Sequence, residues 1–266
     1  MADHRRIVPL FLQKEGGLSN ISSDTSAAAN PAPCTITYKG RTASNWHTNK
    51  GVTWLTFSSL APKLGYTASC SNFERMPAEI WGKIFKEGFW DKWNLDKMDS
   101  QMIAETVVWW HWGSGEGGAR NSFKKYLQSK GINAQSNAEI TQALSRLSKQ
   151  MGEKNLFMEL VDWRIKFYES LNKPQFIRGW KNAQAKFVDF VERYEKYAAH
   201  PKEAKEFLKR ELQAGSISPE EYDSAIRYIN AKSGKAMTRN IIPLSLSLMG
   251  VGLISYALIS ISLNKK

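Results

Sequence analysis

The residue best suited to acid–base chemistry is Glu15, which ends the first apolar segment and precedes Gly16 and Gly17. Residues 5–16 predict a helix with its apolar side chains on one side, and the two glycines end it. A carboxylic acid can give a proton to a substrate at neutral pH when apolar surroundings disfavour its charged form. The helix offers such surroundings, and the glycines leave room for a substrate. The alternative is an exposed glutamate at a helix end, paired with Lys14.

A second carboxylate, Asp24, lies in the polar loop that follows this helix and should face Glu15. It could stabilise developing positive charge or orient a water molecule. The alternative is an aspartate that only forms a turn. Both interpretations stay open at this stage.

Three tryptophans, Trp109, Trp110 and Trp112, lie together in a strongly apolar segment that follows the helix-capping residue Ser100. Successive side chains on a helix point about 100° apart, so the three rings cannot all face one way. We expect at least one ring to be in the core and one to line a substrate groove.

The elements that must position these residues are mainly helical. Residues 18–53 are rich in Ser, Asn, Thr, Ala and Pro, which predicts a long loop with a small hairpin. Further helices are predicted at residues 54–64, 77–86, 102–112, 120–129, 137–149, 156–171, 175–197, 201–214 and 219–231.

Charge and cysteine content limit the partners. The 266-residue chain has a formal net charge of +12, and a basic surface attracts nucleic acid, anionic lipid or the bacterial envelope; a merely solvated surface is the alternative. We expect no nucleic-acid partner, because no nucleic-acid-binding motif is present.

Two cysteines and four scattered histidines form no metal-ligand set, and no cofactor is expected. Cys34 and Cys70 could form a disulfide or remain free thiols.

The two ends of the chain differ. The N-terminus contains no apolar stretch long enough for a signal peptide. Residues 241–263 carry no charge and would span about 34 Å as a helix, which is enough to cross a bilayer. The prediction is a C-terminal transmembrane helix, with a buried core helix as the alternative.

Five short motifs, in this order, resemble glycoside hydrolase family 108 muramidases and the predicted peptidoglycan-binding domain that commonly follows them. They are LFLQKEGGLSN (residues 10–20), HTNKGVT (47–53), PAEIW with GFW (77–81 and 88–90), WGSGEGGAR (112–120), and RIKFY with RGW (164–168 and 178–180). The chain departs from the family in the longer Ser/Ala/Pro loop between Asn20 and His47, which leaves the second catalytic group open.

This resemblance implies a lysozyme-like fold and a lysozyme-type N-acetylmuramidase that cleaves peptidoglycan, with Glu15 as general acid and Asp24 as a candidate second group. It places Thr48, Asn49 and Thr53 at the substrate, and we add Trp109 and Trp110 as substrate-binding candidates. The predicted parts are a catalytic domain (1–125), a peptidoglycan-binding-like half (126–198), a helical stalk (199–239) and a transmembrane helix (240–264).

The expected location is the inner membrane, with a single-pass anchor and action on the periplasmic cell wall, and a holin, phage or secretion machine as further partners. One rival is a non-catalytic docking component of a phage tail or injection machine. A second is a membrane-tethered binder of nucleic acid or lipid. An amidase or peptidase is disfavoured, because His47 and His111 lack a recognisable nucleophile.

Overall fold

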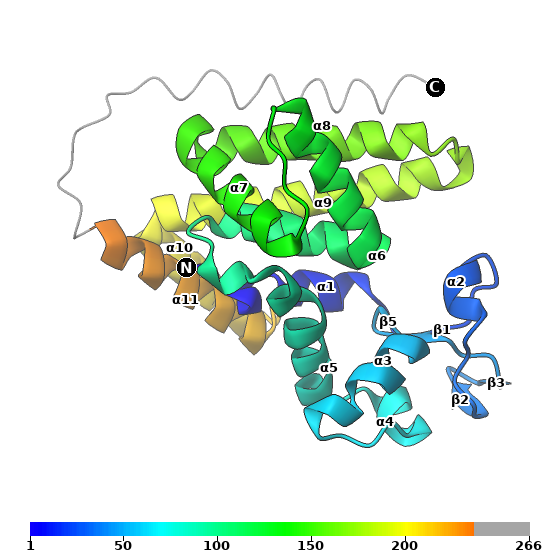
Figure 1. The fold of residues 1–266 in the computed structure, drawn as a ribbon. Coiled ribbons are helices and arrows are strands. Elements are labelled where there is room, and N and C mark those ends of the chain that lie inside the picture. The colour runs from blue at the N-terminus through cyan, green and yellow to red at the C-terminus, as the bar shows by residue number, and fades with distance from the viewer. Residues whose placement is uncertain (237–266) are drawn as a thin grey trace.

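The first helix, α1 (Val8–Lys14), ends at Glu15. Pro9 lies in its first turn, where a missing N–H breaks no hydrogen bond. Phe11 is fully buried in the core, and the Glu15 N–H closes the helix on the Phe11 carbonyl. The structure, a computed structural model, describes residues 1–236 and is mainly helical in that range (Figure 1).

Short strands follow α1. They are β1 (Leu18–Ser19), β2 (Ile36–Tyr38), β3 (Arg41–Ala43), β4 (Thr48–Asn49) and β5 (Val52–Thr53). The order β1-β4-β5 forms one antiparallel sheet, and β2 pairs with β3 in a second. The loop therefore contains the predicted small hairpin, formed by β4 and β5, and also a second one.

Short helical segments complete this part of the chain. They are η1 (His4–Arg6), α2 (Thr25–Ala28), α3 (Trp54–Leu60), η2 (Pro62–Leu64), α4 (Cys70–Arg75), α5 (Ala78–Phe85), a π-helical turn η3 (Lys86–Trp90), η4 (Asp91–Trp93) and η5 (Leu95–Lys97). A disulfide joins Cys34, ahead of β2, to Cys70 at the start of α4. It fixes the long loop to the helices that follow it.

Helix α6 (Gln101–Ser129) begins at Ser100, whose side chain accepts the Ile103 N–H as predicted for an N-cap. Its first half is almost wholly buried. At Gly115 the backbone leaves helical geometry, with φ 71° and ψ 166°, so α6 is two helical segments across a kink. Only glycine adopts such angles without strain, and the kink turns the second segment away from the first.

The remaining helices are α7 (Asn137–Met151), α8 (Glu153–Ser170), α9 (Pro174–Ala199), α10 (Pro201–Gln213) and α11 (Pro219–Ala236). α7 and α8 pack on α6, and α9 packs on α8. α10 and α11, which correspond to the predicted stalk, lie against α9, and α11 also contacts η1. Figure 1 shows the strands and α2 to α5 projecting to one side of this helical mass.

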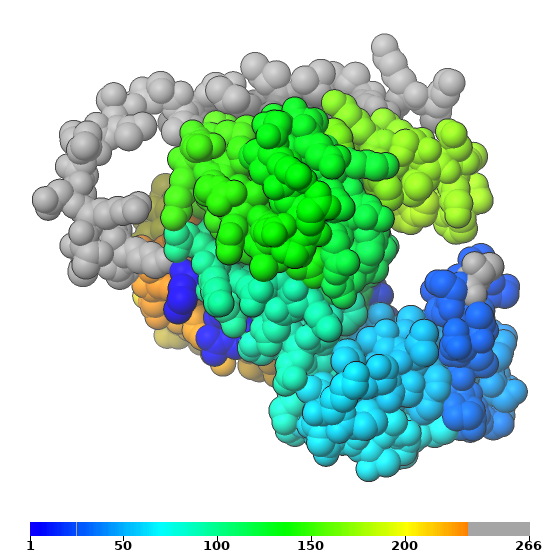
Figure 2. All heavy atoms as spheres, in the orientation of Figure 1, coloured from blue at the N-terminus to red at the C-terminus, as the bar shows by residue number. Residues whose placement is uncertain are grey.

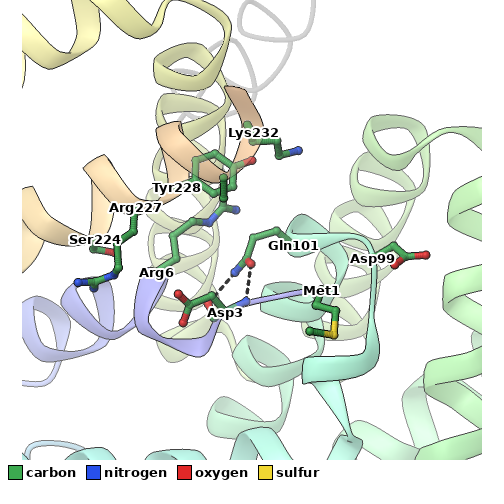
Figure 3. A pocket seen from close by; sticks show the side chains of 10 residues that line it. Met1, Asp3, Arg6, Asp99, Gln101, Ser224, Arg227, Tyr228 and Lys232 are labelled. Carbon is green, nitrogen blue, oxygen red and sulfur yellow. Dashed lines mark hydrogen bonds between the residues drawn. The ribbon is translucent and has the colours of Figure 1, made fainter. Parts of the chain in front are cut away.

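A buried ion pair joins η1, near the start of the chain, to α6. Arg6 is 2% exposed and donates to Glu105, with Nε to Oε1 at 2.6 Å. Burial disfavours the charge on Arg6, but the Glu105 carboxylate overcomes this effect and raises the pKa of the guanidinium above its usual range. The guanidinium also lies 4.2 Å from the ring centre of Tyr228 on α11. Figure 3 shows the small pocket here, of about 70 Å³, with Asp3 and Gln101 hydrogen-bonded at its wall.

None of the helices within residues 1–236 is long and apolar enough to cross a membrane. The long helices there carry charged side chains on exposed faces, as helices around a core do. The segment predicted as a transmembrane helix, residues 240–264, lies outside the described residues. The mainly helical fold is confirmed. The predictions of a transmembrane helix and of a single-pass membrane localisation are corrected, because the described part of the chain contains no membrane span.

Candidate active site

Glu15 lies at the end of α1 with its side chain 20% exposed. Its Oε1 atom accepts two hydrogen bonds, from Trp112 Nε1 at 3.0 Å and from Lys14 Nζ at 2.7 Å. Trp112 lies on α6, so the contact joins two segments far apart in the chain. The pairing with Lys14 is the contact expected under the alternative interpretation of Glu15, and it coexists with the contact to Trp112.

An aromatic cluster holds Trp112 in place. Its ring centre lies 4.9 Å from that of Phe11 on α1, 4.6 Å from Phe89 on η3 and 5.7 Å from Trp81 on α5. Tilted and edge-on contacts at such distances are favourable for aromatic rings. The indole N–H therefore reaches Glu15 from a rigid position.

The turn between β4 and β5 closes over Glu15. Lys50 and Gly51 both have positive φ, at 46° and 77°, as the tightest hairpin turns require. Gly51 has no room for a side chain: an added Cβ would lie 2.7 Å from Glu15 Cγ and 2.6 Å from Trp112 Cζ2. Trp81 donates its indole N–H to the Lys50 carbonyl at 2.9 Å. The backbone of the turn thus forms one wall of the site.

The three polar residues predicted at the substrate flank this turn. Asn49 is buried, and its Nδ2 donates to the carbonyls of Phe73 and Glu74 at 2.6 and 2.7 Å. Thr53 caps α3, and Thr48 Oγ1 is hydrogen-bonded to a ring nitrogen of His47. All three contacts fix the hairpin. Their role in substrate binding stays a prediction.

Asp24 is exposed and immediately precedes α2. Its Oδ1 accepts hydrogen bonds from Ser26 Oγ at 3.2 Å and from the Ala27 N–H at 3.5 Å. These contacts are those of an aspartate that starts a helix. Within residues 1–236, Asp24 forms no hydrogen bond with Glu15. A catalytic role for Asp24 stays a prediction.

The tryptophans of α6 divide as helical geometry requires. Trp109 stacks on Phe187 of α9, with ring centres 5.0 Å apart and planes 7° apart, and lies 5.1 Å from Lys14 Nζ. Trp110 is 1% exposed and packs edge-on against Phe123. Trp110 is therefore a core ring, whereas Trp109 and Trp112, three residues apart, share the face toward α1.

Comparison with known proteins identifies the first part of the chain. Residues 8–115 match the family model described as "Glycosyl hydrolase 108". These residues belong to glycosyl hydrolase family 108. No curated protein matches the chain. A solved structure described as "Structure of Brucella abortus SagA" is 19% identical, with 70% of this chain and 93% of that chain covered and a TM-score of 0.47.

The glycosyl hydrolase 108 domain contains Glu15, the Gly51 turn and Trp112, and it ends at the kink of α6. A groove of about 360 Å³ is lined by Lys14 and Trp112, the two residues that donate to Glu15, and continues onto α8 and α9. Its lining residues are Lys14, Trp109, Trp112, Gly113, Ser114, Arg164, Phe167, Tyr168, Leu171, Gly179, Trp180 and Ala183. Figure 2 shows the surface hollowed between the α8–α9 turn and the part that carries α2, β2 and β3.

Three important residues were absent from the predicted site. Trp112 contacts Glu15 directly, Gly51 lies against it, and Arg164 lines the adjacent groove. Trp112 could have been found from its spacing of three residues from Trp109, which puts both on one helix face. Gly51 could have been found from the Asn-Lys-Gly turn sequence. The membrane, holin and phage partners gain no support from the described residues or from the comparisons.

Proposed function

We propose that this protein hydrolyses the glycan strands of peptidoglycan as an N-acetylmuramidase, with Glu15 as the general acid. Membership of glycosyl hydrolase family 108 supports a glycosidase. The disulfide between Cys34 and Cys70 also supports it, because such bonds persist in oxidising surroundings, and peptidoglycan lies outside the reducing cytoplasm.

The observation that carries the proposal is the asymmetric environment of the Glu15 carboxyl group. Trp112 and Lys14 both donate to Oε1. Oε2 is therefore the oxygen left to carry the proton that a leaving glycosidic oxygen takes up. Lys14 and Trp112 also line the groove, so the two donors that hold the Glu15 carboxyl group border a space of sugar size.

The test is Glu15→Gln on purified cell walls, with release of reducing sugar ends as the measurement. Glutamine keeps an oxygen for Trp112 and Lys14 but supplies no acidic proton, so we expect a loss of roughly 10²- to 10⁴-fold in rate. Glu87→Gln is the matched control, since Glu87 is an exposed carboxylate on η3. Unchanged activity in Glu15→Gln would exclude Glu15 as the acid. Mass spectrometry of the fragments separates hydrolysed from anhydro sugar ends.

One observation favours a second candidate, a wall-binding docking component without catalysis. The Lys14 ammonium group lies 2.7 Å from the Glu15 carboxylate, which is the ion pair expected of a structural glutamate at a helix end. A docking protein would bind peptidoglycan and release no sugar ends, and Glu15→Gln would leave its binding unchanged. The same two assays therefore separate the two functions.

A further inference from the structure

Arg164 on α8 is a buried cation without an acidic partner. It is 3% exposed, and within residues 1–236 no carboxylate forms an ion pair with it. Its Nε donates to Tyr168 Oη at 2.8 Å, and its Nη1 lies 3.5 Å from Ser114 Oγ. The guanidinium also faces the ring of Trp110 at 4.5 Å. Arg6, which is equally buried, has two carboxylate partners, Glu105 and Glu195.

The burial of Arg164 without a carboxylate partner is energetically unfavourable unless another group neutralises its positive charge. Removing a charge from water without a counter-charge is strongly unfavourable. Burial lowers the pKa of Arg164, and the Tyr168 hydroxyl opposes the effect only in part. Guanidinium groups nevertheless remain protonated in proteins, so Arg164 keeps a positive charge that its neighbours in the fold do not balance.

The groove beside Glu15 is where this charge can be balanced. Arg164 lines it together with Lys14, and its lining contains no acidic side chain. Gly113, near the end of the first α6 segment, packs directly against the guanidinium: an added Cβ would lie 2.9 Å from Arg164 Nη2. Trp112 and Trp180 supply aromatic surface in the same groove. Arg164 has no carboxylate partner within residues 1–236, whereas Lys14 is also paired with Glu15. Both lie among aromatic rings in the groove lining, which fits an anionic ligand that also carries apolar or sugar groups.

We propose that this groove binds a carboxylate of peptidoglycan, with Arg164 and Lys14 as its ligands. The proposal rests on the proposed function, because it places the strand's own acidic groups beside the bond that Glu15 protonates. Muramic acid carries a lactyl group, and the peptide stem attached there ends in carboxylates. An arginine can donate two N–H hydrogen bonds at once to such a carboxylate.

The first experiment changes the substrate and leaves the protein intact. Strands with free carboxylates are compared with strands whose carboxylates are converted to amides. For the wild type we expect KM to rise by about 10-fold or more on the amidated strands, because a charge-assisted contact is lost. We expect kcat to change less than about twofold, since Glu15 is untouched. Strands whose stems have been removed by an amidase show whether the lactyl carboxylate or the stem supplies the contact.

The second experiment changes the protein. Arg164→Gln should raise KM on free-carboxylate strands by a similar factor and show no further rise on amidated strands, whereas Arg164→Lys should keep much of the discrimination. Arg193→Gln is the matched control, because Arg193 is exposed on α9 and outside the groove lining. Equal KM for free and amidated strands in the wild type would overturn the proposal, whatever the fold of the variants.

A binding assay separates this inference from the lytic function. Glu15→Gln protein is titrated with soluble muropeptides in the acidic and the amidated form. Preference for the acidic form without any cleavage by the wild type would support the groove and reject the muramidase. Cleavage by the wild type with equal binding of the two forms would support the muramidase and reject the groove.

Discussion

The indole N–H of Trp112 points at Glu15 Oε1 from 3.0 Å, across 97 positions of sequence. This contact joins the end of α1 to the last turn before the kink of α6. It leaves the second carboxyl oxygen for chemistry, and it depends on the ring being held by Phe11 and Phe89. The contact makes Trp112 a positioning residue for the proposed acid.

Replacing Trp112 with Phe should reduce activity more than stability. The variant keeps an aromatic ring in the cluster but loses the hydrogen bond to a carboxylate, a contact worth about 1.5–3 kcal/mol, or roughly 10- to 100-fold in rate. Reducing-end release and thermal unfolding are measured together. Trp163→Phe is the control, because it removes an indole hydrogen bond to Ser122 far from Glu15. Equal effects of the two variants on activity would contradict the positioning role.

Gly51→Ala should disturb both the turn and the acid. The backbone at Gly51 has φ 77°, and the new methyl group would collide with Glu15 and Trp112. We expect a loss of about 1–3 kcal/mol of stability and a large loss of activity. Gly40→Ala imposes a similar backbone, φ 76°, with nothing within 4 Å of its added Cβ. Urea unfolding of both variants separates the backbone effect from the collision, and equal activities would argue against a wall formed by Gly51.

Removal of the disulfide should destabilise the long loop. Cys34 and Cys70 are 36 positions apart, and closing a loop of that length stabilises the folded state by about 4 kcal/mol in the chain-entropy description. The Cys34→Ser, Cys70→Ser double variant should therefore unfold at a lower temperature than the oxidised wild type. A reductant should lower the midpoint of the wild type and leave that of the double variant unchanged. An effect of the reductant on both would point to another cause.

Stability should fall in acid because of His111. Burial lowers the pKa of this imidazole to about 4, from 6.5 in the unfolded chain, and its Nδ1 accepts the Trp93 indole N–H. The unfolded chain therefore binds the proton first as pH falls, and the free energy of unfolding should decrease by up to roughly 3 kcal/mol between pH 6.5 and 4.

Urea midpoints at several pH values test this dependence. His111→Asn retains an acceptor for Trp93 and should show a shallower decrease than the wild type. His200→Asn is the control, since His200 is an exposed histidine between α9 and α10. An unchanged slope in His111→Asn would assign the acid sensitivity to other groups.

Local signals in the sequence predicted much of the fold. The glycines after Glu15 end α1, Ser100 caps α6, and prolines begin α9 to α11. Each of these effects acts within a few residues, so it can be recognised without knowing the fold. The hairpin around Gly51 is similar, because its turn sequence restricts the backbone directly.

The partners of the site residues could not be predicted in this way. Trp112 meets Glu15, and Asn49 is used to hold α4, only because the chain returns to α1 after many intervening elements. The disulfide was one of two open interpretations for the same reason. The unbalanced charge of Arg164 becomes visible only when its neighbours are known, since its sequence surroundings contain ordinary acidic residues.

The kink of α6 bears on whether the chain could be cut there into two separately folded fragments. The family match stops at that kink, yet Trp109 before it stacks on Phe187, and Trp110 packs beneath Arg164. A fragment cut at residue 115 would expose both indole rings to water and would lose more than half of the residues that line its groove. We therefore expect residues 1–115 to fold poorly when they are expressed without α8 and α9.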